Sequence, residues 1–488
     1  MDLLDSHPPG HARATGGTPS RRGLLGVLLV AQLMVILDIS AVNVALPDMA
    51  EELELAGGDV GWVITSYSMI FGSLLLLGGR ATDLLGRRRV FLAGLAVFTV
   101  ASLVSALSLS APMLFAARAG QGLGAAMLSP AALSIITTAF QGKERAKALG
   151  AWGAVGGAGA AAGVLLGGVL TDVADWRAIF YINLPIGVAL AVATLRVAPA
   201  DPARPKWRGL DLRGATLATV SLAAVLYATS QAGSAGWASA QTLGLGLAGA
   251  VGLAGFAALE RRTGQPLLRV ERLTDRAVGG GFVMMLMASA VLFGMFLLSS
   301  LYLQNMLGTG PLQTGLAFLP VAIAAGVGAH VGSQLVNRLG VRVPMAGAFA
   351  AVAVGMLLLT AGAGRSGSYM VSLLPGMVLG GLGLGVVLVG VAFAVLTGAR
   401  DDESGMLSGL NTTGHEVGGS FGVAVLVSIA TAAAESGSSP IGASGFADAF
   451  LAAAVLAALG SLTALVVLPS ARTFLPQLRL APAPIGMH

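Results

Sequence analysis

The sequence has no cysteine and very little charge. Without cysteine, the chain forms no disulfide, no cysteine-ligated zinc or iron–sulfur site and no thiol nucleophile. Only 10% of its 488 residues are charged, against about 25% in an ordinary soluble domain, and 55% are hydrophobic. A chain of this length and composition cannot cover a water-soluble globule, so lipid must be its solvent.

Motifs of motors and enzymes are missing as well. The chain has three lysines and no Gly-x-x-x-x-Gly-Lys-[Ser/Thr], which excludes an ATP-driven motor in this polypeptide. It has no His-Glu-x-x-His, no Gly-x-Ser-x-Gly and no cluster of histidines, so a metalloenzyme or serine hydrolase has no visible site. We therefore expect a protein that is not an enzyme and that needs no metal or other cofactor.

The apolar residues are gathered in runs of membrane-spanning length. A helix needs about 20 apolar residues to cross a bilayer. The first run is longer than the hydrophobic region of a signal peptide and many similar runs follow it, so we reject that alternative. The sequence predicts an all-α integral membrane protein with fourteen transmembrane helices, near 24–46, 60–79, 90–109, 113–140, 148–170, 179–198, 212–232, 241–259, 277–303, 312–336, 344–363, 369–397, 405–433 and 448–468.

The basic residues gather on one side of this predicted topology. With the N-terminus inside, 25 of the 28 Lys and Arg residues fall in inner loops and tails, whereas Arg177 and Arg365 lie outside and Arg118 lies within a span. Because cytoplasmic loops are enriched in Lys and Arg, this asymmetry predicts a multi-pass protein of the cytoplasmic membrane with both termini in the cytoplasm. The net charge of +5 then reflects membrane orientation, and no nucleic-acid partner is needed to explain it.

A weak internal repeat divides the chain. Residues of the loop after the second span have counterparts 254 residues later, after the tenth span: Gly78, Asp83, Leu85, Gly86 and Arg88 correspond to Gly332, Asn337, Leu339, Gly340 and Arg342. Transporters are often built from such repeats, with the substrate site between the halves near the middle of the bilayer. We expect five parts: a disordered cytoplasmic tail (1–23), a six-helix bundle (24–198), two inserted helices with flanking loops (199–276), a second six-helix bundle (277–470) and a cytoplasmic tail (471–488).

The loop after the second span is short and densely charged. From 79 to 89 it reads Gly-Arg-Ala-Thr-Asp-Leu-Leu-Gly-Arg-Arg-Arg. This segment resembles the signature loop of the major facilitator superfamily. The resemblance implies the major facilitator fold, with two six-helix bundles, and a cytoplasmic charge network that holds one conformational state. Arg88 and Arg89 also fit a simpler role as residues that fix membrane orientation. The residues implied for the network are Gly79, Asp83, Gly86, Arg87 and Arg88.

An acid lies inside the first span. A carboxylate within a bilayer is costly, so Asp38 is expected to face a cavity and to mark an ion or substrate pathway. The segment 37–47, Leu-Asp-Ile-Ser-Ala-Val-Asn-Val-Ala-Leu-Pro, resembles the first-helix motif of the fourteen-helix drug:proton antiporters, the EmrB/QacA-like branch of the superfamily. The resemblance implies that Asp38 couples transport to a proton or another cation, and that Asn43 and Pro47 set the shape of the helix. The alternative is a structural Asp38 paired with a neighbouring helix.

A base lies inside the fourth span. Arg118 is followed by a run of small residues, and the segment resembles the family motif in which such an arginine is implicated in proton transfer. A guanidinium keeps its proton, so its role would be electrostatic: it can hold a nearby carboxylate ionised and release it when water or substrate intervenes. We therefore predict that Asp38 and Arg118 form the proton-coupling pair.

The fifth span carries a glycine pattern close to the antiporter motif of the same branch. The pattern comprises Gly159, Gly163, Gly167 and Gly168, but Val164 stands where the family has proline. Glycines at this spacing support close helix packing. The missing proline removes a kink, and whether it alters antiport stays open. Further segments that resemble the branch are 176–185, 209–214 and 260–268.

Three titratable residues in spans are not explained by the shared motifs. His415 and Glu416 stand in the thirteenth span, where the branch more often has Arg and Gln. An acid beside a histidine could bind a cation or carry a second proton, and it could equally be a polar contact between helices. His330, in the tenth span, is a lone histidine among glycine and alanine, for which a hydrogen bond between helices is the favoured interpretation.

Aromatic and polar residues of several spans are candidates for the wall of a substrate cavity. Apolar walls with a few polar groups suit lipophilic cations or aromatic drugs. Residues of these types at helical spacing also serve simply as packing. The candidates are Asn43, Trp62, Tyr67, Phe71, Gln121, Tyr302, Gln304, Asn305, Phe318, His330 and Asn411.

Together these patterns predict a proton-coupled secondary transporter. It would export lipophilic or cationic drugs or antibiotics by alternating access, as a monomeric drug:proton antiporter driven by the proton gradient. Its partners would be a small-molecule substrate, protons and the lipid bilayer. One alternative is a dedicated exporter of a single metabolite or self-made antibiotic. A more distant one is a membrane sensor or scaffold that transports nothing, which leaves Asp38 and Arg118 without a purpose.

Overall fold

The computed structural model describes residues 21–55, 62–201, 211–264, 266–363, 368–397, 399, 403–432 and 442–480. All regular secondary structure within these residues is helical. Each of the fourteen predicted spans contains a long helix or a pair of consecutive helices.

The helices fall into a first half, an inserted pair and a second half. The first half contains α1 (Arg21–Glu52), α2 (Trp62–Leu85), α3 (Arg87–Ala106), α4 (Ala111–Ala139), α5 (Gly142–Val173), α6 (Ala178–Tyr181) and α7 (Asn183–Val197). Next come α8 (Leu212–Ala235), α9 (Ala240–Glu260) and the 3-10 turn η2 (Val270–Thr274). The second half contains α10 (Val278–Asn305), α11 (Pro311–Ala317), α12 (Leu319–Leu339), α13 (Arg342–Ala363), α14 (Tyr369–Ser372), α15 (Leu374–Leu396), α16 (Ser404–Ala432), α17 (Ala443–Val467) and α18 (Ala471–Leu480).

Prolines divide three of the predicted spans. In each case the longer, second helix has a proline among its first three residues: Pro185 in α7, Pro320 in α12 and Pro375 in α15. Proline has no backbone N–H to donate to the preceding turn, so the helix is interrupted there and restarts with proline in its first turn.

Eleven of the helical segments in the described part of the chain are long and apolar enough to cross a membrane. The helices α5, α8 and α16 are not in that set. In α16, the polar run Asn-Thr-Thr-Gly-His-Glu at 411–416 lowers the hydropathy of the segment. The structure therefore bears out an all-helical membrane protein, and fourteen crossings stay a prediction.

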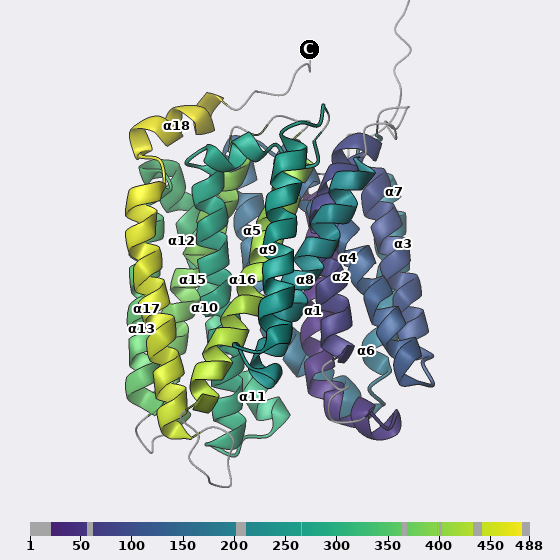
Figure 1. The fold of residues 1–488 in the computed structure, drawn as a ribbon, viewed down its shortest axis with the longest axis vertical. Helices are drawn as coiled ribbons and strands as arrows, with labels where there is room; N and C mark the ends of the chain where they lie inside the picture. Colours follow the sequence, from purple (N-terminus) through teal and green to yellow (C-terminus); the bar gives the residue numbers. More distant parts are fainter. Residues whose placement is uncertain are drawn as a thin grey trace, which may run out of the picture.

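The two halves pack side by side. Within the first half, α4 packs on α2 and α3, and α1 packs on α5; within the second, α15 packs on α12 and α13, α13 on α17, and α10 on α16. The halves meet along two seams, where α2 contacts α16 and α5 contacts α12. The inserted α8 packs on α9 and also contacts both α2 and α16, so it covers one seam (Figure 1).

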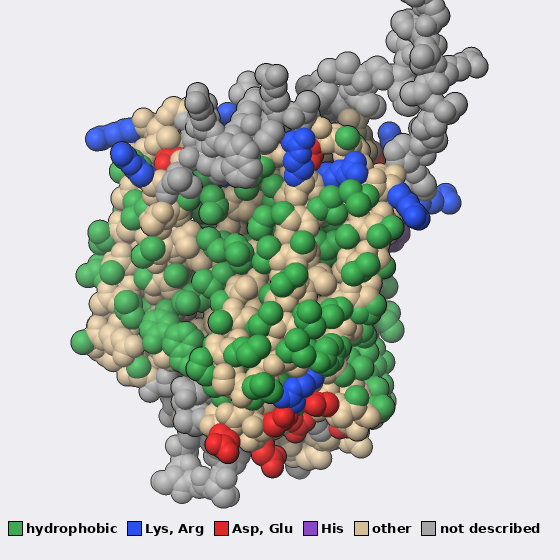
Figure 2. Space-filling model, turned by 90° about the vertical axis from the view of Figure 1, so that its right-hand side faces the viewer, with side chains coloured by type: hydrophobic (Ala, Val, Ile, Leu, Met, Phe, Trp, Pro, Cys, Tyr) green, Lys and Arg blue, Asp and Glu red, His purple; other side chains and the backbone are tan. Residues whose placement is uncertain are grey.

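Charge is concentrated at the ends of the bundle and hydrophobic side chains around its middle. Figure 2 shows Lys and Arg mainly at the upper end, where α18 lies, and Asp and Glu mainly at the lower end. We call these the basic end and the acidic end. The band between them includes exposed Val188 and Leu195 on α7 and Leu247 on α9, as expected of helices that face lipid.

At the acidic end, an ion pair and a hydrogen bond join α1 to the turn before α6. Glu52 accepts hydrogen bonds from Arg177 Nη1 (2.7 Å) and Trp176 Nε1 (2.6 Å), and the Arg177 guanidinium lies 4.3 Å from the centre of the Trp176 ring. These bonds, from Arg177 first and Trp176 second, lower the pKa of Glu52 below its usual value of 4.5. The first helix and the α5–α6 connection are thereby tied together.

The internal repeat recurs in three dimensions. Gly86 and Gly340 have positive φ angles, 106° and 72°, immediately before α3 and before the turn into α13; glycine adopts such angles without strain. Arg88 donates to the carbonyls of Leu195 and Ala198 at the end of α7. Its counterpart, Arg342, donates to the carbonyl of Leu468 at the end of α17. Equivalent arginines therefore cap equivalent helices in the two halves.

The predicted tails are described only in part. Residues 21–23 of the predicted N-terminal tail belong to α1, and 1–20 lie outside the described residues. The beginning of the predicted C-terminal tail forms α18, which contains Pro476.

Candidate functional site

The acid of the first span is buried in the first half. Asp38 on α1 is 2% exposed, and Arg118 on α4 is 1% exposed. Arg118 Nη1 donates to Asp38 Oδ2 at 2.5 Å. The structure thus brings together the two residues predicted as a pair. Desolvation of two charges costs several kcal/mol, so such a pair needs further hydrogen bonds to persist.

Further polar side chains supply those bonds. The other carboxylate oxygen, Asp38 Oδ1, accepts from Gln121 Nε2 and from Asn183 Nδ2, each at 2.9 Å. Gln121 Oε1 accepts from Arg118 Nη1 at 2.8 Å. Ser102 Oγ on α3 accepts from Gln121 at 2.8 Å and from Asn183 at 3.3 Å. We call Asp38, Arg118, Gln121, Asn183 and Ser102 the Asp38 network.

Two members of the Asp38 network were not predicted. An intramembrane Asn183 beside Pro185 is a visible signal, because amides are rare in spans. Ser102 gives no such signal, because serine is common in helices that pack closely. Gln121 was predicted for a cavity wall, and the structure shows it as a member of the Asp38 network.

The remaining contacts fix the guanidinium of Arg118. Its Nε donates to the carbonyl of Val63 on α2 at 3.2 Å. Its Cζ lies 4.5 Å from the centre of the Tyr67 ring and 5.9 Å from that of Phe180, within reach of cation–π attraction. Arg118 therefore joins α1, α2 and α4, and a change in the charge of Asp38 would be felt by all three helices.

The glycine face of α5 packs directly against the helix that carries Asp38. A Cβ on Gly163 would overlap Ser40 Oγ, and one on Gly167 would lie 2.7 Å from Ala41 Cα. Gly159 faces Leu33 and Ile36 in the same way, and Gly168 is buried. These glycines let α1 and α5 come close on both sides of Asp38. The side chain of Val164 lies outside the described part.

The charged loop docks onto the other half of the molecule. Asp83, near the end of α2, accepts from the backbone N–H groups of Gly405 and Met406, each at 2.9 Å. These amides belong to the first turn of α16, where N–H groups have no partner within the helix and the helix dipole favours an anion. A Cβ on Gly79 would overlap the carbonyl of Gly405. The close approach of α2 and α16 thus depends on glycine.

The basic residues of the loop bind within the first half. Arg87 Nε donates to Ser134 Oγ on α4 at 3.1 Å. Arg88 caps the end of α7, and Asp201 accepts from the backbone N–H groups of Arg88 and Arg89 at the start of α3. These contacts hold the loop rigidly behind Asp83.

A second contact joins the halves at the same end. Arg145, in the first turn of α5, donates through Nη2 to the carbonyl of Leu396 at 2.6 Å. Leu396 ends α15, where a cation is favoured by the helix dipole. Arg145 is one of the 25 basic residues that the predicted topology places in inner loops and tails. At the basic end, the two halves are therefore joined by Asp83 at the start of α16 and by Arg145 at the end of α15.

The structure separates His415 from Glu416. His415 Nδ1 lies 2.6 Å from Ser289 Oγ, and its ring lies 5.1 Å from that of Phe293, both on α10. Glu416 faces α2 instead, where a Cβ on Gly72 would lie 3.4 Å from Glu416 Cβ. The two side chains therefore do not face one common site, because adjacent residues of a helix point about 100° apart. For His415 the structure shows the polar contact between helices, and a role in carrying a second proton stays a prediction for Glu416. Among the described residues there is no group of three His, Asp or Glu that could hold a metal.

Several cavity candidates are buried. Tyr67 and Phe71 pack on each other beside Arg118, with ring centres 5.6 Å apart. Trp62 is half-buried and packs on Tyr227 of α8. Phe318 stacks on Phe296 at 4.3 Å. Two others are buried in the second half: Tyr302, whose hydroxyl donates to the carbonyl of Ala363, and Asn411, which is 6% exposed.

Other candidates are exposed. Gln304 and Asn305 lie at the end of α10, and Gln304 donates to Ser300 of the same helix. His330 is exposed and bonds with Gln334 one turn along α12, at 2.9 Å. The favoured bond from His330 to another helix is therefore wrong. The side chain of Asn43 lies outside the described part.

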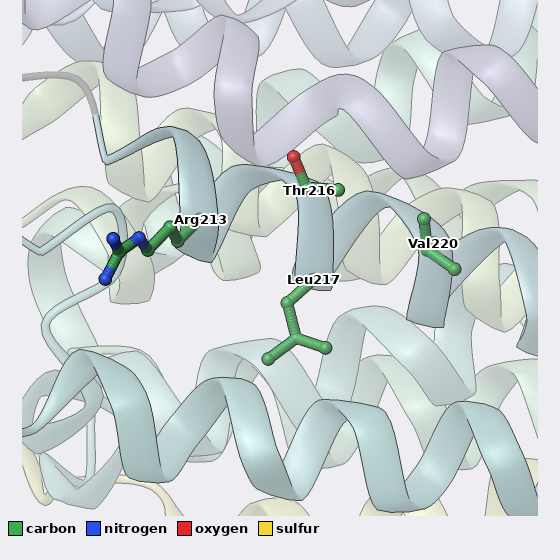
Figure 3. Close-up of a pocket in the computed structure, with 4 residues that line it drawn as sticks. All are labelled: Arg213, Thr216, Leu217 and Val220. Atoms are coloured by element: carbon green, nitrogen blue, oxygen red, sulfur yellow. The ribbon is translucent and has the colours of Figure 1, made fainter.

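Two surface hollows are formed by residues that the sequence did not single out for transport. One, of about 590 Å³, is lined by Arg213, Thr216, Leu217 and Val220 of α8 (Figure 3). Another, of about 500 Å³, lies between α3 and α4 and is lined by small and branched apolar residues such as Val100 and Gly120. Neither includes a member of the Asp38 network.

Comparison with known proteins identifies the family. Residues 28–423 match the Major Facilitator Superfamily, which is most of the chain. The chain therefore belongs to the Major Facilitator Superfamily, in agreement with its all-helical fold and with the resemblance of its charged loop.

The similar proteins include antibiotic exporters. The puromycin resistance protein pur8 of Streptomyces alboniger is 39% identical over 445 residues, 90% of this chain and 88% of that protein. The cephamycin export protein CmcT of Amycolatopsis lactamdurans is 38% identical over 448 residues, 90% of this chain and 91% of that protein. The resemblance to the drug-exporting branch is thereby confirmed.

A solved structure shares the fold. The crystal structure of the human organic anion transporter MFSD10 (TETRAN) matches with a TM-score of 0.67 and 18% identity, over 92% of this chain and 100% of that one. At this identity the likeness concerns the fold alone.

Proposed function

We propose that the protein exports lipophilic or cationic antibiotics or drugs in exchange for protons. The buried Asp38–Arg118 pair carries the proposal, because an ionisable pair inside a membrane helix bundle marks an ion pathway. Relatives named for resistance to puromycin and for export of cephamycin support the class of substrate. The proton gradient drives the cycle, without ATP or another cofactor.

Asp38 is the group that takes the proton. While it is ionised, Arg118, Gln121 and Asn183 hold its two oxygens. A proton bound to Oδ2 removes the charge that attracts Arg118, so the pair loosens and the guanidinium relies on Gln121, the Val63 carbonyl and the Tyr67 ring. Because α5 packs on α1 through glycine at this level, the change passes to α5 and its seam with α12.

Unpaired polar atoms on α2 and α16 support a path for protons or substrate. Four buried oxygens have no hydrogen-bond partner in the described part of the chain. They are the hydroxyls of Ser66 and Tyr67 on α2, the hydroxyl of Thr413 on α16 and the side-chain carbonyl of Asn411 on α16. Buried polar groups normally have partners, so water or a bound molecule would fill this role. Glu416, on the same helix, is the candidate for a second proton.

The basic end is the cytoplasmic face in this proposal, since cytoplasmic loops carry the excess of Lys and Arg. All fourteen helical segments then cross the membrane, with both termini inside, and the transporter acts as a monomer. The contacts of Asp83 and Arg145 close the cytoplasmic side in the described state. Alternating access requires both to break when the inward-facing state forms.

Replacing Asp38 by Asn tests the coupling. In proteoliposomes with an imposed pH gradient, we expect Asp38→Asn to lower gradient-driven transport of puromycin and a set of lipophilic dyes by about tenfold or more, and to abolish the discharge of the gradient on adding substrate. Asp172→Asn, an exposed acid at the far end of α5, is the control and should transport normally. Full transport and equal proton discharge by Asp38→Asn would refute the assignment.

The same assay decides the breadth of the substrates. Export of one compound from a panel of unrelated cationic, neutral and anionic drugs would favour the dedicated exporter, which is kept as an alternative because the two relatives are each named for one antibiotic. Lack of any substrate-linked proton flux would favour a membrane sensor or scaffold.

A further inference from the structure

A second buried carboxylate lies beside the Asp83 contact. Glu403 directly precedes α16, and its side chain is 2% exposed. It accepts hydrogen bonds from both Arg269 Nη1 and Arg272 Nη2, forming an ion pair with each. A carboxylate so deeply buried needs such partners, because a lone buried charge is strongly destabilising.

The two arginines come from the linker that follows the inserted helices. Arg269 directly precedes η2 and Arg272 lies within it, between α9 and α10, and η2 packs on α10. The backbone N–H of Arg269 also points at Met406 Sδ, 3.3 Å away. Because α10 packs on α16, the linker and the first turn of α16 form one unit of the second half.

Glu403 and Asp83 act on the same turn of α16. The carbonyl of Glu403 accepts from Leu407 N at 2.9 Å and so starts the helix, and the next amides, of Gly405 and Met406, are the ones that bind Asp83. We propose that Glu403 is a positioning residue of the cytoplasmic gate: held by Arg269 and Arg272, it orients the first turn of α16 to receive Asp83. The inference rests on the proposed alternating-access function.

The charges explain why two arginines are needed. A carboxylate at the start of α16 would compete with Asp83 for the positive end of the helix dipole and would repel it. Two guanidiniums offset the charge of Glu403, so that its remaining effect on the gate is to fix the linker to the first turn of α16. Hydrogen bonds to Glu403 raise the pKa of Arg272 above its usual value, so the cluster stays charged.

The arrangement also gives the linker after the inserted helices a part in the cycle. When the cytoplasmic side opens, the Asp83 contact breaks because it joins the two halves. The Arg269–Glu403–Arg272 cluster stays whole because all three residues move with the second half. The gate would therefore close again onto a turn that is already formed.

The absence of cysteine makes the test direct, because labels can be placed without removing native thiols. Spin labels at Lys147→Cys on α5 and Arg338→Cys on α12, both exposed near the basic end, report the distance between the halves without substrate or a proton gradient. In this background we compare Glu403→Gln, Asp83→Asn and the double variant. Asp275→Asn is the control, since it removes only an exposed partner of Arg272.

We expect Glu403→Gln to raise the ratio of open to closed cytoplasmic gate by about fivefold to tenfold, and Asp83→Asn by at least as much. The double variant should match Asp83→Asn within about twofold, because Glu403 acts through Asp83. Asp275→Asn should leave the distances unchanged. The inference is overturned if Glu403→Gln leaves the label distances unchanged. It is also overturned if the double variant changes the open-to-closed ratio by the product of the two single effects.

Two further arms keep the test decisive. If Glu403→Gln does not fold, Arg272→Gln, which keeps Arg269 as a partner for Glu403, must give a shift in the same direction. The distances are read without transport, so a failure of proton coupling in Asp38→Asn would leave this result standing and would be recognised separately.

Discussion

At the scale of single residues, the main feature of the candidate site is a buried carboxylate, Asp38, both of whose oxygens accept hydrogen bonds. Asp38 Oδ2 is bound by Arg118, and Oδ1 is bound by Gln121 and Asn183. An isolated charge in this position would be expelled from the bilayer interior or neutralised. Arg118, Gln121 and Asn183 compensate the buried carboxylate, and in the proposed cycle these are the bonds that rearrange when Asp38 takes a proton.

The amide of Asn183 gives a test at this scale. Asn183→Leu removes one donor to Asp38 and leaves Oδ1 under-satisfied, so we expect a loss of about 1–3 kcal/mol in stability and slower gradient-driven transport. Thermal unfolding of the purified protein and proteoliposome transport measure the two effects. Ser102→Ala, which removes a group that does not touch Asp38, should have a smaller effect on both. Equal effects of the two variants would contradict the role of Asn183.

At the scale of helices, glycine decides which pairs come close. Gly159, Gly163 and Gly167 allow α5 to lie against α1 around Asp38. Gly79 and Gly405 allow α2 to lie against α16 beside Asp83. In a bilayer, no hydrophobic effect draws helices together, so close van der Waals packing of small residues has a larger share in choosing partners.

Filling the α2–α16 contact should therefore open the gate. Gly79→Ala places a methyl group against the backbone of Gly405. Backbone atoms cannot turn aside as a flexible side chain can, so the two helices must move apart. We expect a loss of about 1–3 kcal/mol and a longer Lys147–Arg338 label distance. Gly347→Ala, where a Cβ meets no atom within 4 Å, is the control. A variant of Gly79 with unchanged label distances would show that the contact does not hold the gate.

At the scale of the whole molecule, the inserted α8 and α9 are the feature that sets the chain apart from a twelve-helix design. The helix α8 lies over the seam of α2 and α16, and α9 packs on α8. Trp237 at their turn donates to Ser428 of α16 at 2.7 Å. If the pair crosses the membrane, this turn lies on the outer side, with the acidic end.

Labelling of single cysteines settles the topology. Ala238→Cys, exposed in the α8–α9 turn, should react with a membrane-impermeant maleimide added outside intact cells, whereas Arg261→Cys, at the other end of α9, should react only after permeabilisation. The native chain, which has no cysteine, is the blank. Labelling of both positions from the same side would contradict fourteen crossings.

Much of this could be predicted from the sequence, and the exceptions share a cause. Asp38 and Arg118 are visible because charge inside an apolar run is costly and therefore meaningful. Gln121 and Asn183 are visible only as amides within spans, and Ser102 is not visible at all, because the partners of all three depend on which helices meet. Likewise Glu403, Arg269 and Arg145 look like ordinary loop charges until folding places them at the ends of α16 and α15.

By itself, the sequence determined that the protein is a helical membrane protein, which segments form its helices, and which ionisable residues lie inside them. These properties follow from composition, run length and the cost of charge in lipid, all of which are local. Only the tertiary structure decided that His415 and Glu416 face different helices, that Gln121 belongs to the Asp38 network, and that Asp83 closes the basic end. Those facts depend on contacts between segments tens to hundreds of residues apart, and packing geometry alone selects them.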